Sequence, residues 1–104
     1  MTMRQRLPQR RQCESFTLEL YGLRYTATFS RLPGGAVGEV FLSNHKPGSQ
    51  SDSNARDAAV AASLALQHGC PLDVLRRALL RDAQGRPATP LAAALDLISE
   101  SERP

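Results

Sequence analysis

The chain has 104 residues, of which 41% are hydrophobic and 22% charged, and its formal net charge is +3 at pH 7. A chain of this length buries somewhat over ~60% of its unfolded surface, which suffices for one core. No apolar run approaches the ~18 residues of a membrane-spanning helix, no signal-peptide core follows the basic start, and two cysteines make no disulfide framework. We therefore expect a single cytoplasmic domain without membrane attachment.

The positive charge is concentrated near the N-terminus. Four arginines precede the first acidic residue: Arg4, Arg6, Arg10 and Arg11. Without them the net charge would be 3 − 4 = −1. We expect residues 1–11 to form a flexible basic arm, residues 12–100 one domain and residues 101–104 a tail. The arm is either solvated or bound to nucleic-acid phosphates, and the lack of interleaved aromatic residues for base stacking favours the first.

Two segments alternate apolar and polar residues with the period of half-buried strands, residues 14–20 and 24–30, and residues 36–42 form a third predicted strand. Gly22 and the Pro-Gly-Gly sequence at 33–35 supply the turns between them, so an antiparallel meander is expected. Gly38 inside the third segment indicates a β-bulge or a close backbone approach.

A polar loop at 43–53 leads into an alanine-rich segment with helical spacing. Asn54 is a plausible N-cap, with Asp57 on the favourable side of the helix dipole. Gly69 fits the C′ position that ends the helix. Because this segment is apolar on nearly all sides, we expect it to be buried.

Two further helices are predicted. Pro71 begins one, and Thr89 followed by Pro90 has the N-cap and N1 residues of the other. The fold class is therefore α+β, with a three-stranded antiparallel meander packed on about three α-helices in two layers. Because such a sheet has exposed edges and one open face, we expect a homodimer through the open face, a strand edge or the surplus alanine surface of the first helix.

The loop before the first helix is a candidate anion or ligand site. It combines a cation, glycine-permitted backbone approach and a helix N-terminus, in Lys46, Gly48, Ser49 and Asn54. The Gly-x-x-x-x-Gly-Lys spacing of a phosphate loop is absent. The alternative is a polar loop with a capped helix.

A second basic cluster lies on the polar flank of the second helix, in Arg76, Arg77 and Arg81. Together with the arm it could bind nucleic acid, the alternative function. The four candidate metal ligands match no zinc spacing: Cys13, His45, His68 and Cys70. Ser49 and Ser63 lack an assignable base. We expect no metal, no cofactor and no catalytic residue.

The most specific sequence feature is a series of short runs. Gly-Glu-Val-Phe-Leu at 38–42 is followed by Lys-Pro-Gly-Ser at 46–49 and by Ser-Leu-Ala-Leu-Gln-His-Gly at 63–69. Together with the Arg-Gln-Arg-Leu-Pro run at 4–8, they resemble the TSCPD domain at the C-terminal side of adenosylcobalamin-dependent ribonucleotide reductases. The resemblance covers about residues 4–80.

The resemblance implies an α+β module associated with ribonucleotide reduction and DNA biosynthesis. In the reductases, a large barrel carries the radical cysteine, the cobalamin site and the substrate site, and 104 residues do not hold it. The cysteine-rich tail of many family members is also missing. The implied function is an accessory interaction module without enzymatic activity of its own, whose partner is a ribonucleotide reductase or a nucleotide.

Overall fold

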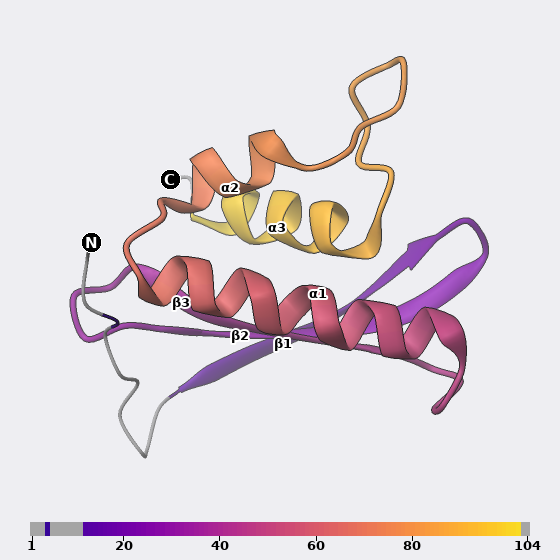
Figure 1. The fold of residues 1–104 in the computed structure, drawn as a ribbon, viewed down its shortest axis with the longest axis horizontal. Coiled ribbons are helices and arrows are strands. Elements are labelled where there is room, and N and C mark those ends of the chain that lie inside the picture. Colours follow the sequence, from indigo (N-terminus) through magenta and orange to yellow (C-terminus); the bar gives the residue numbers. More distant parts are fainter. Residues whose placement is uncertain (1–3, 5–11, 103–104) are drawn as a thin grey trace.

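The computed structural model describes residue 4 and residues 12–102 and confirms the predicted two-layer α+β fold. The elements are β1 (Cys13–Leu20), β2 (Leu23–Arg31), β3 (Val37–Asn44), α1 (Gln50–Gln67), α2 (Leu72–Ala78) and α3 (Pro90–Ser101) (Figure 1). The sheet is antiparallel in the order β1-β2-β3. Of the predicted basic arm, only Arg4 is among the described residues.

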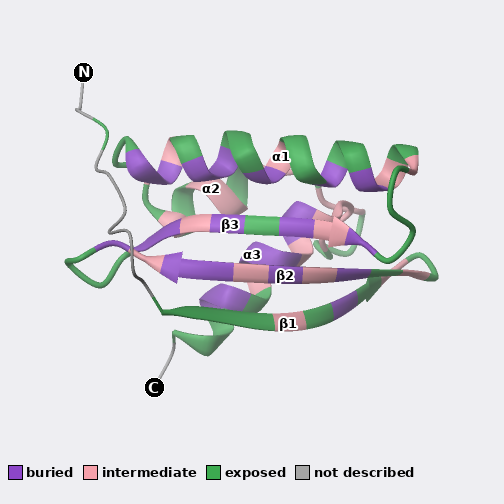
Figure 2. Cartoon of the chain, turned by 90° about the horizontal axis from the view of Figure 1, so that it is seen from below, coloured by how far each residue is buried: buried purple, intermediate pink, exposed green. Residues whose placement is uncertain are grey.

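The helices lie on one side of the sheet, and α1 runs along its β3 margin (Figure 2). The most deeply buried helix is α3, in which Ala92, Ala94, Leu95 and Ile98 are fully buried. The opposite side of the core consists of alternate strand residues, among them Leu18, Phe29 and Val40. The alternation seen in the sequence therefore gives each strand its inward face.

The turn predicted at Gly22 and the bulge or close backbone approach predicted at Gly38 are both present. The β1–β2 hairpin has a two-residue turn in which Tyr21 and Gly22 have φ values of 52° and 77°, as a type I′ turn requires. Gly38 packs against Leu32, because a Cβ at position 38 would lie 2.5 Å from Leu32 Cγ. The register shifts nearby, between Ser30 and Arg31, so the bulge and the close approach occur together.

The start of α1 differs from the prediction. Asn54 is not the N-cap: the helix begins at Gln50, and the Ser49 hydroxyl accepts a hydrogen bond from the Asp52 amide. Apolar periodicity misses this first turn because its residues are polar. The predicted end is confirmed, since Gly69 has a φ of 98° and the Cys70 amide donates to the Ala65 carbonyl in a Schellman motif.

The other helix boundaries agree with the sequence. The Thr89 hydroxyl accepts from the Ala92 amide, and Pro90 is the first residue of α3. The expectation that α1 is buried on all sides is wrong, because Val60 and Leu64 are 58% and 40% exposed. In the described part of the chain, no helix is both long and apolar enough to cross a bilayer.

Candidate functional site

The outer edge of β3 is closed by side chains of α1. The Ser63 hydroxyl accepts from the Val40 amide at 2.9 Å and donates to the Val40 carbonyl at 3.0 Å. One turn later, Gln67 Nε2 donates to the Gly38 carbonyl at 3.0 Å. Both side chains are buried, so these bonds satisfy backbone groups that an edge strand otherwise leaves unpaired.

The third contact to this edge comes from the buried carboxylate of Asp52. Its Oδ1 accepts from the Asn44 amide at 2.9 Å, while its Oδ2 accepts from the Gly48 amide at 3.2 Å and from Arg56 Nε at 2.9 Å. The Asn44 amide, followed by Arg56, holds the pKa of Asp52 below its ordinary value of 3.8, although burial raises it. Asp52 is therefore an internal anion at the start of α1.

This carboxylate occupies the centre of the predicted ligand loop. The Gly48 amide is directed at Asp52, and the Ser49 hydroxyl caps the Asp52 amide. Lys46 and Asn54 are exposed, and Asn54 lies on the first turns of the helix rather than in the loop. An external anion at this position has to compete with Asp52. The anion site stays a prediction, with Lys46 as its exposed cation.

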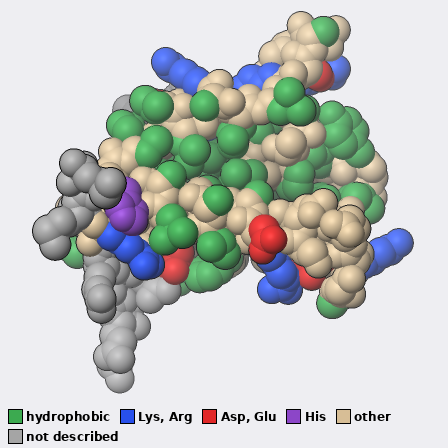
Figure 3. Space-filling model, in the orientation of Figure 1, with side chains coloured by type: hydrophobic (Ala, Val, Ile, Leu, Met, Phe, Trp, Pro, Cys, Tyr) green, Lys and Arg blue, Asp and Glu red, His purple; other side chains and the backbone are tan. Residues whose placement is uncertain are grey.

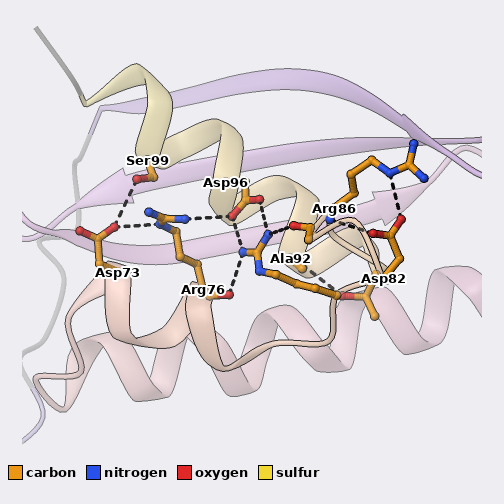
Figure 4. A network of polar contacts seen from close by, with 10 residues as sticks. Asp73, Arg76, Asp82, Arg86, Ala92, Asp96 and Ser99 are labelled. Atoms are coloured by element: carbon orange, nitrogen blue, oxygen red, sulfur yellow. Dashed lines mark hydrogen bonds and ion pairs between the residues drawn. The ribbon is translucent and has the colours of Figure 1, made fainter.

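Of the three arginines predicted on the second helix, Arg76 and Arg77 lie in α2 and Arg81 follows it; Figure 4 shows Arg76 between Asp73 and Asp96. Arg81 binds both carboxylate oxygens of Asp96, at 2.7 and 2.8 Å. Arg76 bridges Asp73 at 2.8 Å and Asp96 at 3.4 Å. The paired Arg81 guanidinium is the main cause of the lowered pKa of Asp96. These ion pairs hold α2 and the following loop against α3, so Arg77 is the exposed arginine of the three.

The candidate metal ligands and nucleophiles have other contacts. His45 Nε2 lies 2.9 Å from the Thr26 hydroxyl, and His68 Nδ1 lies 2.8 Å from the Leu64 carbonyl. Within residues 12–102 and residue 4, no group of three His, Cys, Asp or Glu side chains is arranged to hold a metal ion. The Ser63 hydroxyl is engaged on both sides by β3.

An apolar surface that the sequence did not reveal lies on the outer side of α1 and β3. Phe41, Val60 and Leu64 are 50%, 58% and 40% exposed and line one groove of about 390 Å³. Arg56 and Glu39 also line it, as charged groups of opposite sign. We call Phe41, Val60 and Leu64 the α1–β3 patch.

A second groove, of about 520 Å³, lies between α1 and the segment that joins α2 to α3. Apolar side chains dominate its lining, namely Ala55, Ala58, Leu79, Leu80 and Leu91. Figure 3 shows apolar side chains gathered over the face formed by the three helices. Leu80 is 68% exposed there.

Sequence reasoning did not assign Asp52, Ser63 or Gln67 to the edge of β3. The signal was present, because these polar residues recur in phase with the buried alanines of α1 rather than on the exposed side. A polar residue on a buried helix stripe requires a hydrogen-bond partner, and an adjacent strand edge supplies one.

Most of the chain resembles a short segment of two much longer proteins. The chain is 33% identical over 73 residues to the "Vitamin B12-dependent ribonucleotide reductase" of Bradyrhizobium diazoefficiens, a match covering 70% of this chain and 6% of that protein. It is also 33% identical over 70 residues to the reductase of the same name from Agrobacterium fabrum, covering 67% of this chain and 6% of the other. No family model and no solved structure matches.

The similarity indicates a domain related to one short segment of these reductases. The chain spans about 6% of the length of the curated relatives it matches. The relation to ribonucleotide reductase that the sequence runs suggested is therefore supported at the level of this segment. The assignment to the TSCPD domain stays a prediction, because no family model matches.

Proposed function

We propose that this chain is a non-catalytic interaction module that binds a vitamin B12-dependent ribonucleotide reductase. The similarity of about 70% of the chain to a segment of two such reductases carries the proposal. In those proteins the similar segment is covalently joined to the rest of the reductase. A related domain on this chain is suited to bind the same kind of surface from outside.

The residues of the most specific sequence run support a role without catalysis. Ser63 and Gln67 fasten α1 to β3, and the bonds of Asp52 extend this contact to the start of the helix. These polar groups are engaged in the architecture. The outer side of α1 is therefore the part of the helix available for contact with another molecule.

We propose the α1–β3 patch as the surface that binds the reductase. Its three apolar side chains lie together in one groove that also contains Arg56, and an apolar centre with an arginine nearby is characteristic of protein interfaces. A nucleotide at the loop of Lys46 is less favoured, because the Gly48 amide already binds Asp52. Nucleic acid is less favoured, because Arg76 and Arg81 are paired with aspartates.

The test is a binding titration of the purified chain against the vitamin B12-dependent reductase from the same organism, by calorimetry or biolayer interferometry. We expect saturable binding that Phe41→Lys and Val60→Lys each weaken at least tenfold, since a charge placed in an apolar contact must be desolvated. Arg77→Ala is the matched control on a different surface and leaves the affinity unchanged.

Absence of binding to the reductase would contradict the proposal, as would equal affinity of the patch variants and the control. The same titration with a nucleoside diphosphate, and with an oligonucleotide at two salt concentrations, identifies the alternatives. Binding of either one in place of the reductase overturns the proposed function.

A further inference from the structure

The outer edge of β1 is open, in contrast to that of β3. Within the described residues, β1 has β2 as its sole strand partner. Its eight residues make it as long as β3, and α3 crosses behind it, with the C-terminal end of the helix emerging past the strand (Figure 2). Long, uncovered edges of this kind pair with other strands.

The register identifies the backbone groups that this edge presents. Leu20 and Leu23 flank a two-residue turn and therefore form a hydrogen-bonded pair. By alternation, Ser15, Thr17 and Glu19 direct their amide and carbonyl groups away from β2. The same alternation on β3 directs the even-numbered residues outward, in agreement with their bonds to α1.

Apolar side chains line the same edge. Phe16, Phe29 and Leu97 line a groove of about 380 Å³ beside β1, together with Glu14 and Ser15. Leu97 is 40% exposed, and the rings of Phe16 and Phe29 meet edge to face with centroids 6.3 Å apart. A strand added to β1 would therefore gain apolar contacts as well as backbone hydrogen bonds.

We propose that a second copy of this chain occupies the edge, with its β1 antiparallel to the first β1 across a two-fold axis. The two sheets then form one continuous six-stranded sheet. The favoured register places Ser15 opposite Thr17 of the second copy. It also places Phe16 opposite Phe16 of the second copy, so each ring lies at the groove of the other subunit.

The positions of the charged residues on β1 are compatible with a second copy of the chain at this edge. In a two-fold symmetric antiparallel pair of β1 strands, the hydrogen-bonded pairs form between residues whose backbone groups point away from β2. On β1 these residues are all odd-numbered. Glu14 therefore never lies opposite Glu19 in such a dimer. In the favoured register these two carboxylates lie opposite Leu18 and Cys13 of the second copy, so no like charges meet directly.

The interface is separate from the α1–β3 patch, so the inference does not depend on the proposed function. It also selects among the three dimer surfaces predicted from the sequence. The open sheet face carries the hydroxyls of Ser15, Thr17 and Thr28, which favour water over an apolar contact, and Phe41, the apolar side chain beside Thr28, belongs to the α1–β3 patch. Of the alanines of α1, Ala55, Ala59 and Ala62 lie in the core, while Ala58, Ala61 and Ala65 offer a partner only one methyl group each.

Analytical ultracentrifugation tests the dimer directly. We expect the wild-type mass to be twice 11.3 kDa at micromolar concentrations and the mass of Thr17→Pro to be 11.3 kDa. Proline removes the outward amide of residue 17 without removing a bond to β2, so circular dichroism should stay unchanged. Phe41→Lys is the matched control and remains a dimer.

Cross-linking tests the register independently of any proline effect. In a background with Cys13→Ser and Cys70→Ser, the double variant Ser15→Cys/Thr17→Cys should oxidise to a covalent dimer. Residues in a hydrogen-bonded pair have Cα atoms ~5.5 Å apart, within the range that a disulfide bridges. The single variants place each cysteine opposite a threonine or serine and should cross-link far less.

Four results would overturn the inference. They are a wild-type monomer at high micromolar concentration, a folded Thr17→Pro that remains a dimer, loss of the dimer in Phe41→Lys, and failure of the double cysteine variant to cross-link. Loss of the dimer in Phe41→Lys would assign the interface to the α1–β3 patch instead.

Discussion

The two edges of the sheet are protected in different ways. The edge of β3 is closed within the chain by Asp52, Ser63 and Gln67, whose side chains take the place of a fourth strand. Within the described residues the edge of β1 has no such cover, and the outward backbone groups of Ser15, Thr17 and Glu19 are available to another molecule. A small domain can thus direct strand pairing to one side by sealing the other.

The difference originates in α1, because the sealing residues lie on a helix whose other inward positions are three alanines and Leu66. Ala55, Ala59 and Ala62 are each at most 3% exposed and have short side chains, which lets the helix approach β3 closely. A serine or glutamine at that distance reaches the strand backbone directly. α3, the helix packed against β1, carries a polar residue in phase with its buried stripe, Ser99, but its hydroxyl donates to Asp73 rather than to the strand.

Three side-chain contacts, from Asp52, Ser63 and Gln67, close the edge of β3, and we call them the seal. Removing the first of them, that of Asp52, should have the largest effect on stability. Asp52→Ala leaves the buried Asn44 amide without an acceptor and removes the partner of the Gly48 amide and of Arg56. We expect the lowest melting temperature of all variants described here, measured by circular dichroism. Asp57→Ala, an exposed aspartate of the same helix, is the control; equal melting temperatures would show that the seal does not stabilise the fold.

Ser63→Ala tests the middle of the seal. It leaves both backbone groups of Val40 without a partner inside the protein, which should lower the free energy of unfolding by about 2 kcal/mol. Chemical denaturation measures this. Ser53→Ala replaces an exposed serine of the same helix and should change the free energy by less than about 0.5 kcal/mol. A loss as small as the control's would mean that water replaces the hydroxyl at no cost.

Acid should lower the stability of the fold, both at the contact of Asp52 with β3 and at the aspartates of α2, α3 and the loop between them. The pKa values of Asp52, Asp73, Asp82 and Asp96 all lie below their ordinary value of 3.8. The unfolded chain therefore takes up protons at higher pH than the folded chain, so this stability is complete above about pH 4 and is lost as the pH falls through the folded-state values. Denaturation curves between pH 2 and pH 6 measure it, and Asp52→Asn should show a shallower loss than the wild type. A wild-type stability constant down to pH 2 would contradict this.

The open edge should tolerate change far better than the sealed one. Thr17→Lys places a charge on β1 where the side chain is exposed, so we expect the free energy of unfolding of the dilute monomer to change by less than about 0.5 kcal/mol. Chemical denaturation at the lowest practical protein concentration checks this. A loss comparable to that of Ser63→Ala would show that the two edges are equally important to the monomer.

The smallest effect is expected at the loop beside the seal. If a phosphate-bearing ligand binds there, Lys46→Ala should weaken sulfate or nucleotide binding in a thermal-shift titration, and Arg77→Ala should not. Because Asp52 already accepts the Gly48 amide, we expect any such binding to be weak. The reverse order of the two variants would locate the ligand on α2.

The elements that the sequence predicted correctly are those with a local cause. Strand alternation, the C′ glycine at position 69 and the Thr89-Pro90 helix start depend on neighbouring residues, and all three are confirmed. The N-cap was placed at Asn54 instead of Ser49 because the first turn of α1 is polar and its burial depends on contacts with β3. Helix propensity alone does not identify a polar first turn that is buried against a strand.

The candidate sites were harder to predict for the same reason. The sequence shows a cation, a glycine and a helix start near Lys46, but not that Asp52 turns inward to bind the loop. It shows three arginines in α2 and the loop after it, but not that Arg76 and Arg81 meet Asp96 across a separation of 20 and 15 residues. The exposed apolar side chains were hidden because a helix apolar on all sides predicts burial.

The short distance along the chain between Asn44 and Asp52, eight residues, has a consequence for the newborn protein. The contact needs only β3, the loop and the first turn of α1, all of which leave the ribosome before α2 and α3 do. During N-to-C-terminal synthesis, a nascent β3 is thus shielded almost as soon as it appears. For chaperones and neighbouring nascent chains, β1 would then be the strand edge that is still open to pairing.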